Sequence, residues 1–209
     1  MTGVVPIVLA AGASERMGAP KALLDFGGAS ALERIVRTCR EAGTLPPIVV
    51  VGHEREPVGA EAERLECFVV DNAEPDRGQT SSLQGGLGAL PEEAAAFLVW
   101  PVDVPLVKAA TLRVLAEAYG GDEGEHSIFL PCHTCKRGHP GFFAASLVDE
   151  FLDLPEKQPA SEVIHHDLAR VLEVDVDDPR VLDRINTLEA YRIAVAGDRR
   201  QESGDRRQE

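Results

Sequence analysis

The stretch Val8-Leu-Ala-Ala-Gly-Ala-Ser-Glu-Arg-Met-Gly-Ala-Pro-Lys21 joins the end of an apolar run to small residues and two cations. The run, residues 4–10, is typical of a buried strand, and the small residues after it predict a tight loop. Almost no bulky side chain occurs before Arg16, so the backbone N–H groups of the loop can approach a bound anion closely. Arg16 offers a planar fork for phosphate oxygens and Lys21 a point charge. Together these features predict a loop that binds a polyphosphate.

The glycine pattern of this loop excludes two other phosphate-binding motifs. No Gly-Lys-Ser or Gly-Lys-Thr triplet follows, as the Walker motif requires. The glycine spacing also does not match the dinucleotide fingerprint.

Apolar runs alternate with helical patterns along the chain. Ser30, Glu33 and Gly43 give the first helix a capping box and a stop signal. The alternation predicts an α/β domain with a largely parallel sheet. Three less regular segments, residues 141–145, 161–168 and 171–176, are expected to extend the sheet and to enclose an acceptor site. Strands are predicted at residues 4–10, 48–52, 67–70, 96–100 and 127–131, and helices at residues 31–42, 81–90, 108–119 and 188–195.

Asp103 follows the predicted strand at residues 96–100, between Val102 and Val104. Ligands of parallel sheets bind beyond the carboxyl ends of the strands, so Asp103 and the phosphate loop are expected to meet. A carboxylate among apolar residues is costly unless it is hydrogen-bonded, paired or metal-bound. On spacing alone, a role as helix cap or turn residue and a role as Mg²⁺ ligand both remain open. The phosphate loop favours Mg²⁺, which one or two carboxylates commonly hold together with substrate phosphates.

The composition restricts the classes of function. The chain has 209 residues and a formal net charge of −14, without the basic stripe of a nucleic-acid-binding protein. No apolar run reaches the roughly 18 residues of a transmembrane helix, and no secretory signal is visible at the N-terminus. Four cysteines without regular spacing indicate a reducing, cytoplasmic location. We expect a single domain over residues 1–196 and a disordered charged tail over residues 197–209.

The segment Cys132-His-Thr-Cys135 has two cysteines at a spacing that also occurs in zinc sites. No second cysteine pair lies nearby in the sequence, and only His133 and His139 could complete a set of four ligands. Two incidental thiols in a loop are therefore favoured over a zinc site or a redox pair.

The phosphate loop and four later segments together resemble one enzyme family. The later segments are Gly78-Gln-Thr-Ser-Ser-Leu-Gln-Gly-Gly-Leu87, Pro101-Val-Asp-Val-Pro105, Arg137-Gly-His-Pro-Gly-Phe142 and Ile185-Asn-Thr-Leu-Glu189. In this order they resemble motifs of the nucleotidyltransferases that make nucleotide-sugars and molybdenum-cofactor dinucleotides. The first and third are similar to segments of the molybdenum cofactor cytidylyltransferase branch. The resemblance runs from residue 4 to about residue 195.

The resemblance implies a Rossmann-like, three-layer fold of the nucleotide-diphospho-sugar transferase type, with a mixed, mostly parallel sheet. It also implies Mg²⁺-dependent transfer of a nucleoside monophosphate, above all CMP from CTP, to molybdopterin or the molybdenum cofactor, with release of pyrophosphate. The implied catalytic residues are Arg16, Lys21 and Asp103, and the implied metal ligands are Asp103 and Asn186. The implied acceptor-binding residues are Arg137 and His139. The implied nucleotide-binding residues are Leu9, Ala10, Ala11, Gly12, Ala13, Ser14, Gly18, Gln79, Ser81 and Ser82.

Several of these residues also have ordinary structural interpretations. Asn186 can cap the helix predicted at residues 188–195 instead of binding a metal. Thr80 or Ser81 can cap the helix predicted at residues 81–90, although the side chains at this junction can also read a base or a ribose. His139 can be a turn residue before Pro140.

The reaction implied by the resemblance needs no strong general base. A phosphate monoester is mostly dianionic near neutral pH, because its second pKa is about 6. The protein must instead offset the repulsion between two anions and stabilise the charge that moves between them.

The choice of base depends on Ala10-Ala11-Gly12 in the resemblance. Cytidylyl-transferring members carry Ala-Ala-Gly, whereas guanylyl-transferring members carry Ala-Gly-Gly. The methyl group of Ala11 is therefore expected to crowd a purine and to admit a pyrimidine.

Two alternatives stay open. The first is a nucleotidyltransferase that uses GTP or a sugar-phosphate acceptor. The second is a non-catalytic nucleotide-binding partner in molybdoenzyme maturation, which would not need a metal ligand. The expected partners are a nucleoside triphosphate, a phosphorylated pterin and a molybdoenzyme or its maturation chaperone, with no nucleic acid and no membrane.

Overall fold

The structure of the chain is a computed structural model that describes residues 3–14, 17–155 and 157–205. Within these residues the strand order of one eight-stranded sheet is β3-β2-β1-β4-β7-β5-β6, and β8 pairs with β5. Strand β7 runs antiparallel to both of its neighbours, whereas β1 to β4 are parallel to one another and β8 is parallel to β5. The sheet is therefore mixed and mostly parallel, as predicted. The strands are β1 (Val4–Leu9), β2 (Ile48–Val51), β3 (Phe68–Asp71), β4 (Ala96–Pro101), β5 (Ile128–His133), β6 (Lys136–Arg137), β7 (Gly141–Ala144) and β8 (Val171–Asp175).

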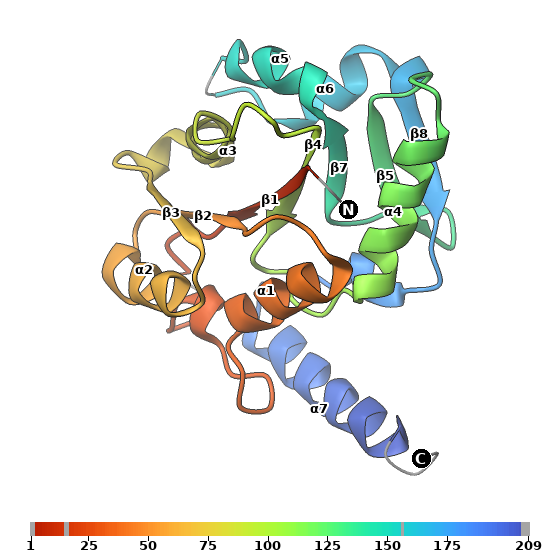
Figure 1. Cartoon of the computed structure of the whole chain (residues 1–209). Coiled ribbons are helices and arrows are strands. Elements are labelled where there is room, and N and C mark those ends of the chain that lie inside the picture. Colours follow the sequence, from red (N-terminus) through yellow and green to blue (C-terminus); the bar gives the residue numbers. More distant parts are fainter. Residues whose placement is uncertain (1–2, 15–16, 156, 206–209) are drawn as a thin grey trace.

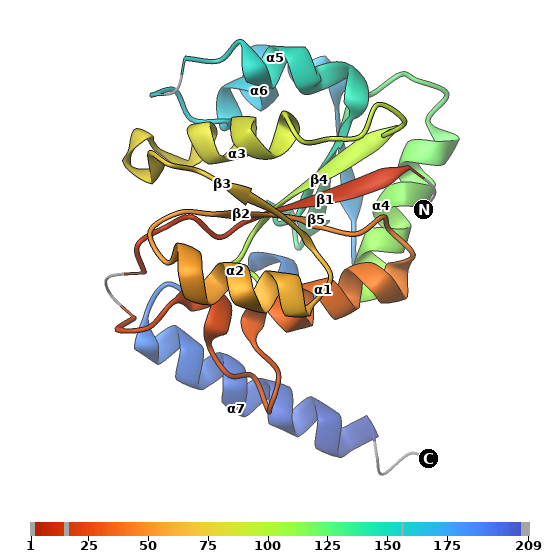
Figure 2. The same cartoon turned by 60° about the vertical axis from the view of Figure 1, so that its left-hand side comes forward.

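Helices cover both faces of the sheet and make three layers (Figures 1 and 2). One face carries α1 (Ala31–Ala42), α2 (Arg55–Arg64) and α4 (Ala109–Gly121), and the other carries α3 (Gln79–Leu87), α5 (Val148–Leu152) and α6 (Ser161–His166). Successive residues of β1 point to opposite faces, so Val4 and Val8 pack in one core and Val5 and Ile7 in the other. The expected three-layer α/β fold is confirmed. Short 3₁₀ turns lie at Lys21–Leu23, Pro75–Arg77, Ala145–Leu147, Leu168–Arg170 and Pro179–Leu182.

Helix α1 begins and ends where the sequence predicted. The Ser30 hydroxyl accepts a hydrogen bond from the backbone N–H of Glu33 over 3.0 Å, and Gly43 ends the helix at a φ of 79°. The cap satisfies a free N–H group of the first turn, and glycine adopts the left-handed conformation without a steric cost.

Two helices begin or end differently from the prediction. Helix α3 begins at Gln79, two residues before the predicted start, because Gly78 turns the chain there with a φ of 109°. Helix α4 begins at Ala109, and the carboxylate of Asp178 caps it by accepting from the Lys108 N–H and the Thr111 hydroxyl. Asp103 does not cap this helix but lies in the turn after β4, so of its two structural alternatives only the helix cap is removed.

The C-terminal segment differs most from the prediction. A helix was expected to end at residue 195 and a disordered tail to follow, yet α7 (Leu188–Asp205) continues through residues 197–205. A helix tolerates an isolated glycine such as Gly197, and Asp198 pairs with Arg34 of α1 over 2.7 Å. On α7, Tyr191 also packs edge-on against Phe26. These contacts hold the helix against the α1 side of the molecule (Figure 2).

None of the helices in the described part of the chain combines the length and the apolar composition that a membrane crossing requires.

Candidate active site

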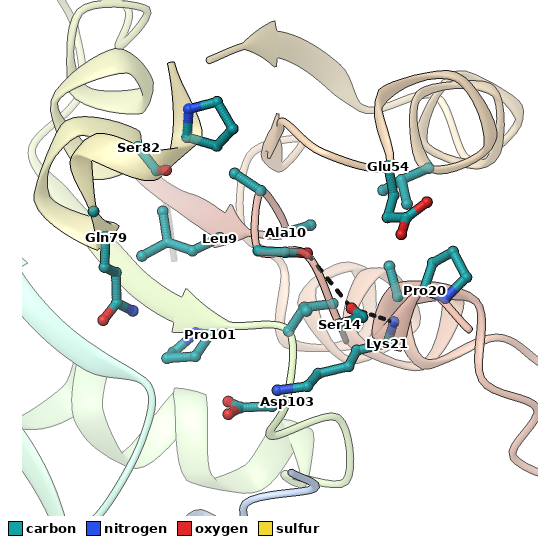
Figure 3. Close-up of a pocket in the computed structure, with 17 residues that line it drawn as sticks. Leu9, Ala10, Ser14, Pro20, Lys21, Glu54, Gln79, Ser82, Pro101 and Asp103 are labelled. Atoms are coloured by element: carbon teal, nitrogen blue, oxygen red, sulfur yellow. Dashed lines mark hydrogen bonds between the residues drawn. The ribbon is translucent and has the colours of Figure 1, made fainter. Parts of the chain in front are cut away.

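A cavity of about 240 Å³ lies beyond the carboxyl ends of β1 and β4, where the sequence placed the site (Figure 3). Such a position follows from the parallel sheet, because the loops after neighbouring strands gather at one edge. The predicted site residues that line the cavity are Leu9, Ala10, Ala11, Gly12, Ser14, Lys21, Gln79, Ser82 and Asp103. Arg16 lies outside the described residues.

The loop after β1 presents unused backbone donors to this cavity. The N–H groups of residues 11–14 donate to no acceptor in the described part of the chain, whereas the neighbouring Ala10 N–H donates to the carbonyl of Val50. Ser14 has a φ of 51°, and its hydroxyl accepts from the backbone N–H of Lys21 over 3.0 Å. The loop therefore folds back on itself and offers successive amides, the arrangement that binds anions.

The base of the loop is fixed against the loop after β2. The N–H of His53 donates to the carbonyl of Ala11, and a Cβ atom on Gly52 would lie 2.7 Å from that carbonyl oxygen. Only glycine fits at position 52 without a shift of the backbone. The same Cβ would lie 2.8 Å from the methyl group of Ala11, so this methyl packs beside Gly52 at the wall of the cavity.

Lys21 and Asp103 meet a segment from the far end of the chain. The Nζ atom of Lys21 donates to Oδ1 of Asn186 over 2.6 Å, and the N–H of Ile185 donates to the carbonyl of Asp103 over 2.7 Å. In Figure 3 the amino group of Lys21 extends to the side of the cavity on which Asp103 lies. Three segments far apart in the sequence thus converge, and for the first loop and Asp103 this was expected from the positions of their strand ends.

One carboxylate oxygen of Asp103 makes no hydrogen bond within the described residues. Its Oδ1 atom is buried and has no hydrogen-bond partner among the described residues. The turn that carries it is rigid, because the indole N–H of Trp100 donates to the carbonyl of Val104 over 2.9 Å. A buried, unpaired carboxylate oxygen is costly, and a hard cation such as Mg²⁺ is the ligand that such an oxygen prefers. The residues at this position therefore fit a divalent metal ion.

The start of α3 forms another wall. Asn72 donates through Nδ2 to the hydroxyls of Ser81 and Ser82, over 3.1 and 2.9 Å, and Ser81 in turn donates to the carbonyl of Gly78. Ser82 borders the cavity, whereas Ser81 is engaged with its neighbours. Sequence reasoning missed Asn72, because a lone asparagine after a strand gives no distinctive signal.

A second cavity, of about 570 Å³, continues from the first. The two share Leu9, Gly78, Gln79 and Pro101. Among the described residues that line the second cavity, every charged side chain is basic, although the whole chain has a net charge of −14. Its apolar wall comprises Leu83, Val99, Leu130, Phe143, Phe151 and Ile164, and its basic residues are Arg77, Arg137, Lys157 and Arg184, with His139 and His165 beside them.

Arg137 and His139, which we expected at an acceptor, both border the second cavity but have different partners. Arg137 is half-exposed, and its Nε donates to Glu173 over 2.7 Å. His139 is held instead by Arg184, whose Nη2 lies 2.7 Å from its Nε2. Burial, and then the charge of Arg184, lower the pKa of His139 to about 4, against an opposing effect of Asp103. The ring is therefore neutral near pH 7.

Arg184 was missed by sequence reasoning. Its only signal was its position directly before the Ile185-Asn-Thr segment. Ala13, Gly18, Ser81 and Asn186 do not line the first cavity, but Asn186 contacts Lys21, and Gly18 has a φ of 66° that keeps the loop turned.

Comparisons with known sequences agree with this geometry. The sequence model of the MobA-like NTP transferase domain matches residues 6–171. The bifunctional protein GlmU of Corynebacterium aurimucosum is 37% identical over 129 residues, which are 58% of this chain and 26% of GlmU. The chain spans about a quarter of the length of this and other curated GlmU relatives that it matches.

Solved structures extend the likeness over nearly the whole chain. Rv0371c of Mycobacterium tuberculosis is 28% identical with a TM-score of 0.80, over 93% of this chain and 98% of that chain. The same protein in complex with manganese is 26% identical with a TM-score of 0.76, over 93% and 99%. A nucleotidyl transferase of Methanothermobacter is 25% identical with a TM-score of 0.81, over 96% and 100%.

The three-layer α/β fold, together with the match to an NTP transferase domain, places the chain in the nucleotidyltransferase class of enzymes. Within this class, the chain belongs to the MobA-like NTP transferase domain family.

Proposed function

We propose that this chain transfers CMP from CTP to the phosphate of molybdopterin, or of a closely similar phosphorylated pterin, and releases pyrophosphate. The observation that carries the proposal is the continuity of the two cavities past Gln79 and Pro101. A donor in the first cavity and an acceptor in the second would bring their phosphates together near Asp103.

The donor's triphosphate would lie on the unused amides of residues 11–14. Lys21 adds a positive charge at the same cavity, and Arg16 remains part of the proposal. The free N–H groups at the start of α3, with the side chains of Gln79 and Ser82, are placed to bind the ribose or base.

Asp103 and Asn186 would hold the metal ion, for which we propose Mg²⁺. The Oδ1 atom of Asn186 has two lone pairs, so it can accept from Lys21 and still bind a cation. When bound, Mg²⁺ would neutralise negative charge on the triphosphate. The manganese complex of Rv0371c supports the use of a divalent cation.

The chain's own residues would then have an electrostatic and positioning role. The acceptor's phosphate is already dianionic at neutral pH, so no side chain needs to remove a proton from it. Lys21 and the loop amides would draw charge from the phosphorus under attack, and the basic lining of the second cavity would offset the repulsion between the two anions.

A second candidate function is transfer to a sugar phosphate. It is favoured by the 37% identity to GlmU, which covers 58% of this chain. The aromatic and aliphatic wall of the second cavity argues for a flatter and less hydroxylated acceptor than a sugar.

The proposal is tested by pyrophosphate release from each of CTP, GTP, ATP and UTP with Mg²⁺, in the presence of molybdopterin, a sugar 1-phosphate or no acceptor. We expect release with CTP and molybdopterin that greatly exceeds every other pair. Release with a sugar phosphate alone would select the second candidate, and binding of CTP without release under any condition would indicate a non-catalytic nucleotide-binding protein.

We also place the reaction in the cytoplasm, where a molybdoenzyme or its maturation chaperone would receive the product. The free state of Cys39, Cys67, Cys132 and Cys135 supports a reducing compartment.

A further inference from the structure

Arg184 is an exposed residue that borders the second cavity. Among the described residues it has no carboxylate partner, and its side chain contacts the neutral ring of His139. By contrast, Arg137, Arg170 and Arg180 each form an ion pair with a glutamate or an aspartate. Arg113 and Arg192 also form no ion pair among the described residues, but unlike Arg184 they border neither cavity. A guanidinium of this kind, directed at a cavity, indicates an anionic ligand.

We propose that Arg184 and His139 form the subsite that binds the acceptor's phosphate, in the role first assigned to Arg137. The inference rests on the proposed function, because it names the residues that would hold the acceptor of that reaction.

The pair leaves several donors for an oxygen anion. A guanidinium only donates, so Nε2 of His139 must be the acceptor of the 2.7 Å contact, and the ring proton of the neutral imidazole is then on Nδ1. The pair therefore offers the remaining N–H groups of Arg184 and the Nδ1–H of His139. Two side chains of different geometry can contact different oxygens of one phosphate.

Backbone contacts fix the pair before any ligand binds. The N–H of His139 donates to the carbonyl of Val181 over 2.9 Å, and a Cβ atom on Gly138 would lie 2.6 Å from that carbonyl oxygen. The glycine is thus required for the connection between β6 and β7 to pack this closely on the segment that leads to Arg184. Such preorganisation lowers the cost of binding an ordered ligand.

The short segment that carries Arg184 contacts residues of both cavities. Ile185 is 2% exposed and packs in the cluster beneath α7, whereas its neighbours Arg184 and Asn186 reach the second cavity and Lys21 respectively. The N–H of Ile185 also holds the carbonyl of Asp103. One short segment therefore places a cation for the acceptor beside the residues that would act on the donor.

The surroundings of the subsite define the class of acceptor. Phe143, Phe151 and Ile164 form apolar parts of the same cavity, so the ligand that fits is a phosphate monoester on a flat body with apolar faces.

Inorganic phosphate, added to the full-length protein without nucleotide, tests the subsite separately from turnover. The readout is the ¹⁵N-histidine NMR spectrum, in which the ring signals of His139 are identified from the His139→Gln variant. We expect phosphate to shift these signals in a saturable way, and Arg184→Gln to weaken the apparent phosphate affinity at least about tenfold. Arg184→Lys should restore part of that affinity, because it keeps the charge and loses the fork.

Two further variants decide between the arginines. Lys136→Gln removes an exposed charge of β6 that borders neither cavity, and should leave the phosphate response unchanged. Equal weakening by Arg137→Gln, or a wild-type spectrum that does not respond to millimolar phosphate, would overturn the proposal. Because the test contains no nucleotide, phosphate can bind to this subsite even if the protein does not transfer CMP. The subsite and the proposed function can therefore be refuted independently.

Discussion

The donor side and the acceptor side of the site are held together by different kinds of contact. On the donor side, the loops after β1 and β4 are positioned by backbone hydrogen bonds and by the parallel pairing of the two strands. On the acceptor side, side chains bridge segments far apart in the sequence: Gln84 of α3 donates through Nε2 to the carbonyls of Phe151, Leu152 and Leu154. The loops after β1 and β4 thus depend mainly on the backbone of the sheet, with the Lys21–Asn186 contact added, whereas residues 151–154 of the acceptor side are held by the single side chain of Gln84.

Removal of the carboxylate charge at Asp103 should have the largest effect, because this group is the proposed metal ligand on the donor side. We expect Asp103→Asn to lower kcat roughly 10²–10³-fold, the order found when one preorganised electrostatic contact is removed. The melting temperature should hardly change, since Oδ1 makes no contact within the described residues. Wild-type turnover in the variant at saturating Mg²⁺ would contradict a metal role.

Lys21→Ala should come next, with an effect confined to the donor. We expect a rise in KM for CTP and a fall in kcat that together lower kcat/KM about 10–100-fold, as for the loss of a charged hydrogen bond. The KM for the acceptor should stay near the wild-type value. Steady-state kinetics with each substrate varied in turn measure this, and an effect on the acceptor alone would refute the assignment of Lys21 to the triphosphate.

Ala11→Gly tests whether the methyl group that packs beside Gly52 also excludes a purine. One methyl group in a pocket is worth about 1–3 kcal/mol, so the ratio of CTP to GTP use should fall about tenfold. Parallel assays with the two nucleotides give this ratio, and an unmoved ratio would show that base choice lies elsewhere in the cavity.

Gln84→Leu should affect the acceptor side alone. Loss of the contacts to the three carbonyls loosens residues 151–154, which border the second cavity through Phe151. We expect the KM for the acceptor to rise several-fold, because the loss of one net hydrogen bond costs about 1 kcal/mol. The KM for CTP should stay the same. A matching rise for CTP would mean that the two sides are not separately held.

The smallest effect concerns stability and pH. Arg170 donates two hydrogen bonds of 2.6 Å to the carboxylate of Glu150. These hydrogen bonds lower the pKa of the Glu150 carboxyl below its usual range. Because the folded pKa is the lower one, the contribution to stability is present above the ordinary pKa of glutamate and is lost as the pH falls through the folded value. We expect Glu150→Gln to cost about 1 kcal/mol at pH 7 and less in acid.

Chemical denaturation at a series of pH values would measure this difference. The matched control is Glu162→Gln on α6, whose carboxylate has no ion pair among the described residues. A stability difference for Glu150→Gln that persisted below the folded pKa would contradict the ion-pair account.

The donor side could be predicted from the sequence because its signals are local. A run of apolar residues, small residues and a lysine in one stretch fixed the strand, the loop and Lys21, and the same reasoning placed Asp103 at the adjacent strand end. Arg184 and Gln84 could not be found in this way, since each acts on residues distant in the sequence, and Asn72 gave no signal that distinguishes it from other loop asparagines. The continuation of α7 past residue 195 was missed for the same reason, because its contact with Arg34 is a tertiary one.

The most direct test of the account is to follow the α-phosphate of CTP, labelled with ³²P, in the presence of Mg²⁺ and molybdopterin. Nucleotidyl transfer predicts that the label joins the pterin product and that the released pyrophosphate is unlabelled, with both products lost in Asp103→Asn. Label that appears as free CMP without an acceptor product, or label that never leaves CTP, would contradict the central claim that a donor in the first cavity reacts with an acceptor in the second.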